Sequence, residues 1–228
     1  MDVVYVTKGG DNPELRYSLR SLQNVKHGRV WVFGSAPPWL NTESVKWCQS
    51  PQRGTPYQST RSHIAAACNH PAVSDPFTLW NDDFYAMKSV GEIPVLHRGS
   101  LDEMLEEAGQ NKTPWWKGIS ESTHLLHKMG FENPLCYDVH APLVVHKAAM
   151  LDTIPLAKKV RSDAFALRSV YGNLAGLRGT RIPDPKVLRR TDPFPRGPWL
   201  SSQHNLFIST MEPVLRYTFP DPSPYEKV

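Results

Sequence analysis

The stretch Pro76-Phe77-Thr78-Leu79-Trp80-Asn81-Asp82-Asp83-Phe84 places two adjacent carboxylates directly after a short apolar run. The run is rich in aromatic and β-branched residues and has polar neighbours at both ends, which is typical of a buried β-strand. Acidic residues at the carboxyl end of such a strand face the crevice in which α/β sheets bind ligands. We therefore expect Asp82 and Asp83 to lie at a binding site.

The two neighbouring carboxylates repel each other unless a positive charge lies beside them. In proteins, Mg²⁺ is typically held by one or two carboxylates together with substrate phosphates. The pair Asp82 and Asp83 therefore predicts a bound Mg²⁺ or Mn²⁺ ion that also contacts a diphosphate. A solvated turn or a helix cap is the alternative for an isolated Asp-Asp pair.

The composition is that of a globular protein of 228 residues, with 40% hydrophobic and 21% charged residues. This length fits one medium-sized domain, or one domain with an appendage. No run approaches the roughly 18 apolar residues of a membrane helix, so we expect no membrane span. Three cysteines without Cys-x-x-Cys spacing argue against disulfides and a zinc site. The sequence thus predicts a cytoplasmic protein.

The apolar pattern of the first half alternates between strand and helix. We expect strands at residues 2–7, 29–33, 45–48 and 76–80, one helix that begins with Asn12 and Pro13, and another at residues 57–69. This order predicts a mostly parallel sheet with helices on both faces, and so an α/β fold.

The second half is less regular. Helices are expected at residues 101–108, 119–129, 146–151 and 162–174, and strand-like pieces at 137–145. Ser100 and Glu103 form a capping-box pattern at the first of these helices.

A basic, proline-rich segment follows, and we expect an irregular arm there. Residues 176–197 contain six basic and two acidic residues, and this excess of four positive charges equals the net charge of +4 of the whole chain. The basic residues are Arg178, Arg181, Lys186, Arg189, Arg190 and Arg196, and the acidic ones are Asp184 and Asp192. Such an arm suits an anionic partner such as nucleic acid, although incidental charge on a solvated loop explains it equally well. We expect residues 1–175 to form the core and residues 176–228 to pack on it.

The turn Lys8-Gly9-Gly10-Asp11 lies between the first strand and the first helix. Flexible glycines, backbone N–H groups and a helix N-terminus together suit a phosphate or a ribose. The turn matches neither Gly-x-Gly-x-x-Gly nor a P-loop, and a plain tight turn is the alternative.

The helix sequence Asn12-Pro13-Glu14-Leu15-Arg16-Tyr17-Ser18-Leu19-Arg20-Ser21-Leu22 resembles a signature of the Stealth family of sugar-phosphate transferases. Further similarities follow in the same order over about residues 2–175. They are the strand ending in Pro-Pro-Trp-Leu at residues 37–40, the helix at 59–66, Asn81-Asp82-Asp83, His140-x-Pro142, and the Arg-rich segment from Arg161 to Arg168. The family's Trp-Val-Asp-Gly after its first strand is replaced here by Val6-Thr7-Lys8-Gly9-Gly10.

The resemblance implies a GT-A-like fold and transfer of hexose-1-phosphate from a nucleotide sugar. The compact chain is similar to stand-alone versions carried in bacteriophage genomes, which are often described simply as glycosyltransferases, so the resemblance leaves open whether a sugar or a sugar phosphate is transferred. A phage origin would place the protein in the host cell cytoplasm.

Specific roles follow for the residues of these motifs. Asp82, Asp83 and His140 are expected to bind the metal ion, which would neutralise the leaving diphosphate. A packed histidine is the alternative for His140. Catalysis would also use Arg161 and Arg168 to clamp a phosphate, because guanidinium groups bind phosphate bidentately. The substrate-binding candidates are Lys8, Gly9, Gly10, Asp11, Arg16, Arg20, His63, Asn81, Trp115 and Trp116.

The sequence therefore predicts a metal-dependent transferase with a nucleotide-sugar donor and a polysaccharide, protein or DNA acceptor. One alternative is a phage enzyme that glycosylates modified DNA bases, which the basic arm and the pair Trp115 and Trp116 favour. Another is a non-catalytic module that binds nucleic acid through the arm.

Overall fold

The computed structural model describes residues 1–52 and 54–227, and its centre is a five-stranded sheet with the strand order β3-β2-β1-β4-β7. The strands are β1 (Asp2–Thr7), β2 (Val30–Gly34), β3 (Lys46–Gln49), β4 (Phe77–Asn81) and β7 (Leu143–Val145). All neighbouring pairs are parallel except β4 and β7, which are antiparallel. The prediction of a mostly parallel α/β sheet is confirmed.

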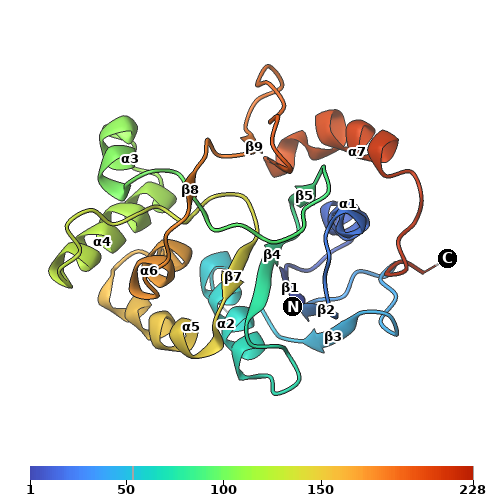
Figure 1. Cartoon of the computed structure of the whole chain (residues 1–228), viewed down its shortest axis with the longest axis horizontal. Helices are drawn as coiled ribbons and strands as arrows, with labels where there is room; N and C mark the ends of the chain where they lie inside the picture. Colours follow the sequence, from blue (N-terminus) through green and yellow to red (C-terminus); the bar gives the residue numbers. More distant parts are fainter. Residues whose placement is uncertain (53, 228) are drawn as a thin grey trace.

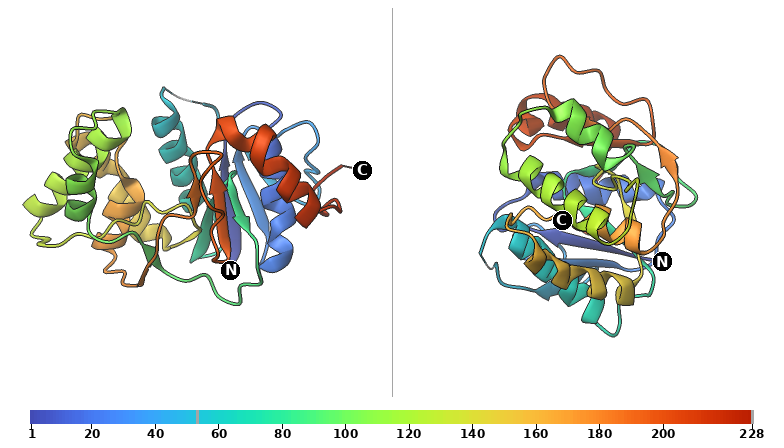
Figure 2. Two further views of the ribbon diagram at one scale, coloured as in Figure 1. Left: turned by 90° about the horizontal axis from the view of Figure 1, so that it is seen from above. Right: turned by 90° about the vertical axis from the view of Figure 1, so that its left-hand side faces the viewer.

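Side chains along β1 point alternately to the two faces of the sheet, and each face is buried against a helix. Val4 and Val6 pack on the side of helix α2 (Pro56–Asn69), and Val3 and Tyr5 pack on the side of helix α1 (Pro13–Ser21). The left view of Figure 2 shows the strands edge-on between these two helices.

Helix α1 begins where the sequence predicts. Asn12 is its N-cap, with Pro13 in the first turn, and the Asn12 side chain accepts a hydrogen bond of 3.3 Å from the Leu15 N–H. Asn12 has φ 46°, a left-handed conformation that asparagine tolerates better than most residues. Leu15, Leu19 and Leu22 are at most 1% exposed, because they form the face that packs on the sheet.

The second half supplies helices α3 (Leu101–Ala108), α4 (Pro114–Lys128), α5 (Lys147–Thr153) and α6 (Leu167–Leu174), which share the core on the α2 side. The capping box of Ser100 and Glu103 is confirmed at α3. Figure 1 shows the four helices together on one side of the sheet.

Two helix boundaries in this half differ from the sequence prediction. Helix α4 begins at Pro114 rather than at residue 119, so that Trp115 and Trp116 lie in its first turn. Helix α6 begins at Leu167 rather than at residue 162. The Glu121 carboxylate binds the N–H groups of Arg161 and Ser162, and this tertiary contact keeps the segment extended.

The C-terminal part forms a second, smaller sheet against the first. Strand β10 (Trp199–Ser202) pairs with β5 (Phe84–Ala86) and with β9 (Lys186–Val187) in this sheet. Strands β8 (Thr180–Arg181) and β6 (Leu96–His97) form a separate two-stranded sheet. The predicted arm is therefore irregular, but it contains two short strands.

The remaining elements are short helical turns and the last helix. They are η1 (Leu22–Asn24), η2 (Ile154–Lys159), η3 (His204–Leu206), η4 (Phe207–Met211) and α7 (Glu212–Thr218). Phe207 and Leu215 of this last part pack with Tyr17 and Tyr85 in a third core. The C-terminal tail thus completes the core around α1.

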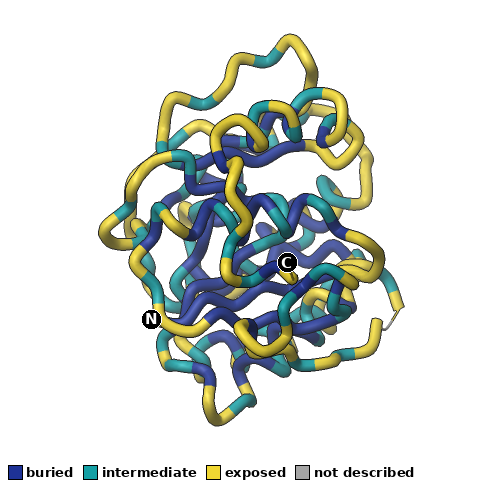
Figure 3. The backbone as a smooth tube through the Cα atoms, turned by 90° about the vertical axis from the view of Figure 1, so that its right-hand side faces the viewer, coloured by how far each residue is buried: buried dark blue, intermediate teal, exposed yellow. Residues whose placement is uncertain are grey.

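Burial follows this layout. Figure 3 shows a dark-blue centre of buried strands, while the long loop at the top of the view is mostly exposed. Among residues 1–52 and 54–227, no helix has the length and apolar character needed to cross a membrane.

Candidate functional site

Two neighbouring cavities lie at the carboxyl ends of β1 and β4. The smaller has a volume of about 180 Å³ and is lined by Thr7 and Lys8 after β1, and the larger has about 390 Å³. Thr60 and Asn81 line both cavities. Asn81 therefore stands at the boundary between them, and the acidic pair follows it directly in the chain.

The two carboxylates of the pair are half-buried and have different partners. Asp82 lines the smaller cavity, and its Oδ2 accepts a hydrogen bond of 2.8 Å from Asn12 Nδ2. Asp83 Oδ2 accepts a hydrogen bond of 3.0 Å from Ser201 Oγ and lies 3.5 Å from Lys186 Nζ. Groups from α1, β9 and β10 therefore converge on the pair.

The environment of Asp82 disfavours its negative charge. Burial, and then the neighbouring Asp83 carboxylate, raise the pKa of Asp82 to about 6, against the opposing effects of Asn12 and Lys8. At neutral pH, the Asp82 carboxylate is thus ionised at an energetic cost. Binding of a cation would relieve that cost.

The His140 imidazole is held in one orientation by Asp184. Its Nδ1 lies 2.9 Å and 3.0 Å from the two carboxylate oxygens, and its backbone N–H also binds Asp184. Burial alone would raise the pKa of Asp184, but the hydrogen bonds from His140 and the nearby Arg98 lower it below its usual value. Asp184 is therefore a carboxylate at neutral pH, and His140 Nδ1 donates to it.

The other imidazole nitrogen, His140 Nε2, lies 3.1 Å from Lys186 Nζ. An ammonium group only donates hydrogen bonds, so Nε2 is the acceptor. Carboxylates that orient a histidine in this way are common around metal ions. The arrangement fits either a metal ligand or a histidine that binds Lys186.

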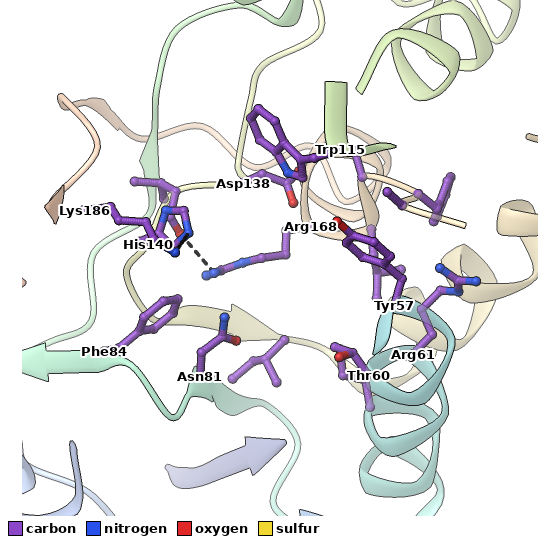
Figure 4. Close-up of a pocket in the computed structure, with 17 residues that line it drawn as sticks. Tyr57, Thr60, Arg61, Asn81, Phe84, Trp115, Asp138, His140, Arg168 and Lys186 are labelled. Carbon is purple, nitrogen blue, oxygen red and sulfur yellow. Dashed lines mark hydrogen bonds between the residues drawn. The ribbon is translucent and has the colours of Figure 1, made fainter. Parts of the chain in front are cut away.

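The larger cavity combines aromatic walls with charged side chains (Figure 4). Tyr57, Phe84 and Trp115 line it, and Arg168 reaches across it toward His140 and Phe84. The Arg168 guanidinium donates to the carbonyl groups of Val139 and Ala141. Burial lowers the pKa of Arg168, and its Nε is buried without a hydrogen-bond partner in the described part of the chain.

The smaller cavity is the more polar of the two. Lys8, His63 and Asp82 line it together with Thr7 and Ser59. His63 is 2% exposed, and burial lowers its pKa against the opposing effect of two backbone carbonyl groups. The imidazole is thus neutral at pH 7.

Two predicted substrate-binding arginines bind the C-terminal tail instead of lining either cavity. Arg20 forms a bidentate ion pair with Glu226, at 2.8 Å and 2.7 Å, and also binds the carbonyl groups of Phe219 and Pro220. Arg16 lies 3.7 Å from the same carboxylate and stacks over Trp39. Their shared helix face points to the tail, which the spacing in the sequence does not reveal.

Some of the other predicted residues line one of the two cavities, and the rest lie outside both. Asn81, His140, Arg168 and Trp115 line the larger cavity, and Lys8 and His63 line the smaller. Arg161 is exposed and lines neither cavity, whereas Trp116 packs at the core edge with its ring 4.6 Å from that of Trp115. The exposed residues Gly9, Gly10 and Asp11 form the loop after β1, also outside the cavity walls.

Sequence reasoning missed four residues that contact the predicted ones: Asn12, Asp184, Lys186 and Ser201. Asn12 was recognised only as a helix cap, and Asp184 and Lys186 only as charges of the arm. Nothing in the local sequence connects them with Asp82, Asp83 or His140, because the contacts span 44 to 118 residues.

Comparison with known proteins adds no family assignment. No protein-family model matches the sequence, and a search of curated proteins finds no relative at a significant level. A proposal for the function therefore rests on the residues and the geometry of the two cavities.

Proposed function

We propose that this protein is a nucleotide-sugar-dependent transferase that moves a hexose or a hexose phosphate onto a macromolecular acceptor. One observation carries the proposal: Asn81 at the end of β4 lines both cavities, and the acidic pair follows it directly. Asp82 lines the smaller cavity, and Asp83 lies outside both linings but 3.5 Å from Lys186, which lines the larger cavity. A nucleotide sugar also has two parts, a nucleotide and a sugar joined by a diphosphate. Each part would occupy one cavity, and the diphosphate would lie at the acidic pair.

The smaller cavity suits the nucleotide. It lies at the carboxyl end of β1, and Lys8 and the N-terminal half of α2 line it. A lysine and a helix N-terminus both favour negative charge. The diphosphate would then reach Asp82 from this side.

The larger cavity suits the transferred sugar and the acceptor. Broad aromatic faces such as those of Tyr57 and Trp115 stack on sugar rings or bases, and Asp138 and Asn81 offer polar groups for hydroxyls. Arg168 adds a buried cation for a phosphate or a leaving group.

A divalent cation fits the chemistry of this site. Asp82 and Asp83 would hold it, with His140 Nε2 as a further ligand, and the donor phosphates would complete its shell. In the described part of the chain, no cluster of three or more His, Cys, Asp or Glu side chains is arranged to hold a metal ion. When bound, Mg²⁺ or Mn²⁺ stabilises the negative charge of the leaving diphosphate.

The topology and the sequence resemblance support the same proposal. An acidic motif that follows the fourth strand of a parallel sheet, with an antiparallel neighbour, is what a GT-A-like enzyme requires. The resemblance to the Stealth family covers Asn81-Asp82-Asp83 and His140-x-Pro142, and Asn81 and His140 of these motifs both line the larger cavity.

A thermal-shift screen of nucleotide sugars with Mn²⁺ tests the proposal. A ligand that binds only the folded state raises the melting temperature. We expect one nucleotide sugar to stabilise the wild-type protein in the presence of Mn²⁺ and to lose this effect in Asp83→Asn. If no nucleotide sugar stabilises the wild-type protein, with or without Mn²⁺, the proposal is wrong.

DNA is a second candidate for the acceptor. The arginines of the arm, Arg178, Arg181, Arg189, Arg190 and Arg196, are all exposed. They lie in the same segment that brings Lys186 to the larger cavity. An extended anion bound along the arm would therefore pass close to the site.

A further inference from the structure

The ammonium group of Lys186 lies between Asp83 and His140, two of the three side chains that are candidate cation ligands. Its Nζ is 3.5 Å from Asp83 Oδ2 and 3.1 Å from His140 Nε2. We infer that Lys186 occupies the cation position in the ligand-free protein and binds the donor's phosphates once a divalent cation takes that position. The inference rests on the proposed function and assigns a phosphate-binding role to a residue that no motif identified.

The first argument is the nature of the contacts. The side chains of Lys186 and Asp83 are each 18% exposed, so the ion pair is shielded from solvent. Both contacts of the ammonium are to groups with lone pairs, as a metal ion would require. The ammonium thus lies where a cation would contact the same oxygen and nitrogen atoms.

The second argument is that the backbone of Lys186 is fixed while its side chain is free to move. Strand β9 pairs with β10 in a register that places Lys186 beside Ser201, and the Ser201 N–H binds the Pro185 carbonyl at 3.0 Å. A lysine carries its charge on four flexible methylene groups. The ammonium is therefore able to shift within the larger cavity, which it also lines, without any movement of the strand.

The third argument is charge balance. Asp82, Asp83 and Lys186 together leave one net negative charge when all three are ionised. A divalent cation and the diphosphate of a nucleotide sugar carry equal and opposite charges, so their binding leaves this balance unchanged. A divalent cation at Asp83 repels the ammonium from its present position, and the incoming phosphates are the nearest new anions.

A purely structural role is the competing explanation, because Lys186 also ties the arm to the acidic pair. The two roles differ in their effect on binding. A tether would change stability alone, or would weaken the binding of every ligand. The inferred role requires opposite changes in the affinity for the metal ion and for the nucleotide.

The experiment measures Mn²⁺ binding by electron paramagnetic resonance and nucleoside diphosphate binding with Mn²⁺ by calorimetry. In Lys186→Met, we expect Mn²⁺ alone to bind about tenfold more tightly and the nucleoside diphosphate to bind about tenfold more weakly, which is the effect of one charge-assisted hydrogen bond. Lys186→Arg retains the charge and should keep nucleotide affinity within about threefold of wild type.

Lys88 provides a matched control. It also ties the arm to the core, through a hydrogen bond of 2.8 Å to the Arg196 carbonyl, but it makes no contact with the acidic pair. Lys88→Met should leave both affinities unchanged.

The outcomes separate the inference from the proposed function. If the wild-type protein binds Mn²⁺ and a nucleoside diphosphate but Lys186→Met changes neither affinity, or lowers both, the inference is wrong and the proposed function stands. If Lys186→Met does not fold, a large loss of nucleotide affinity in a folded Lys186→Arg protein contradicts the inference. If the wild-type protein binds no nucleotide at all, the proposed function and the inference fail together.

Discussion

At the scale of single residues, Asn12 shows how one side chain connects the fold with the site. Its left-handed backbone turns the chain out of the loop after β1, and its Oδ1 caps α1. Its Nδ2 donates to Asp82 and so orients that carboxylate. The site is therefore coupled to the start of a helix that the local sequence already specifies.

The ionised side chain of Asp82 should lower the free energy of unfolding. Its folded-state pKa of about 6 exceeds the ordinary value of 3.8, so ionisation at higher pH disfavours the folded state, and this penalty disappears as the pH falls through 6 toward 4. We expect Asp82→Asn to unfold at higher urea concentration than wild type at pH 8, by about 1–3 kcal/mol, and to lose metal-stimulated turnover.

The pH dependence provides the check on this prediction. The difference in stability between Asp82→Asn and wild type should shrink toward zero near pH 4, where both side chains are neutral. A variant that is less stable than wild type at pH 8 would show that the Asp82 carboxylate stabilises the fold.

At the scale of elements, a buried carboxylate binds the C-terminal tail to α1. Glu226 is 6% exposed and accepts two hydrogen bonds from the Arg20 guanidinium, which also donates to two carbonyl groups of the tail. Burial alone would raise the pKa of Glu226, but the bonds from Arg20 and Ser223 lower it below its usual value. This ion pair, rather than a substrate phosphate, satisfies Arg20.

Glu226→Gln should therefore destabilise the protein at pH 7. Removing one partner of a buried ion pair leaves the other uncompensated and costs about 3 kcal/mol. Because the folded-state pKa of Glu226 is lowered, this contribution is present above pH 4.5 and is lost as the pH falls through the folded-state pKa. Urea unfolding at pH 7 and at pH 4 measures the difference, and equal stability of variant and wild type at pH 7 would contradict it.

The small sheet is the second element that completes the core. Trp199 of β10 packs edge-on against Trp80 at 5.8 Å, and Leu200 lies in the third core with Tyr85. All four residues are at most 3% exposed. Residues 1–175 alone would leave the Trp80 and Tyr85 side chains without this cover.

A protein that ends at residue 175 should consequently lose its cooperative unfolding. We expect exposed apolar surface, a weakened near-ultraviolet circular dichroism signal and a broad urea transition, whereas the full chain should unfold in one step. A sharp transition in the shortened protein would show that residues 1–175 fold independently.

At the scale of the whole molecule, the arm carries exposed positive charges that do not contact the acidic pair. Arg189 and Arg190 are exposed, and no described ion pair involves them, whereas Lys186 of the same segment is directed to the acidic pair. The excess positive charge of the chain thus lies in the segment that also supplies Lys186 to the larger cavity. In the proposed reaction, such a segment would suit an anionic acceptor.

If DNA is the acceptor, replacing both Arg189 and Arg190 by alanine should weaken DNA binding and reduce its dependence on salt. Each phosphate contact contributes about 0.9 to the slope of log affinity against log salt, so the slope should fall by about 2. Lys158→Ala with Lys159→Ala, an exposed basic pair in η2, is the matched control. An unchanged slope in the arginine variant would leave polysaccharide or protein as the acceptor.

The sequence alone determined the local elements of this protein. The start of α1 at Asn12 and Pro13, the capping box of α3 and the bounds of β1 all follow from neighbouring residues, because caps and apolar periodicity act over a few positions. The same local signals located Asp82 and Asp83 at the end of a buried strand.

Only the tertiary structure decided which charges meet. Lys186 and Ser201 contact Asp83 from more than 100 residues away, Asp184 orients His140, and Glu226 binds Arg20. Each of these charged side chains has several chemically equal partners in the chain, so spacing in the sequence cannot select among them. Packing of the small sheet and of the tail onto the core makes that choice.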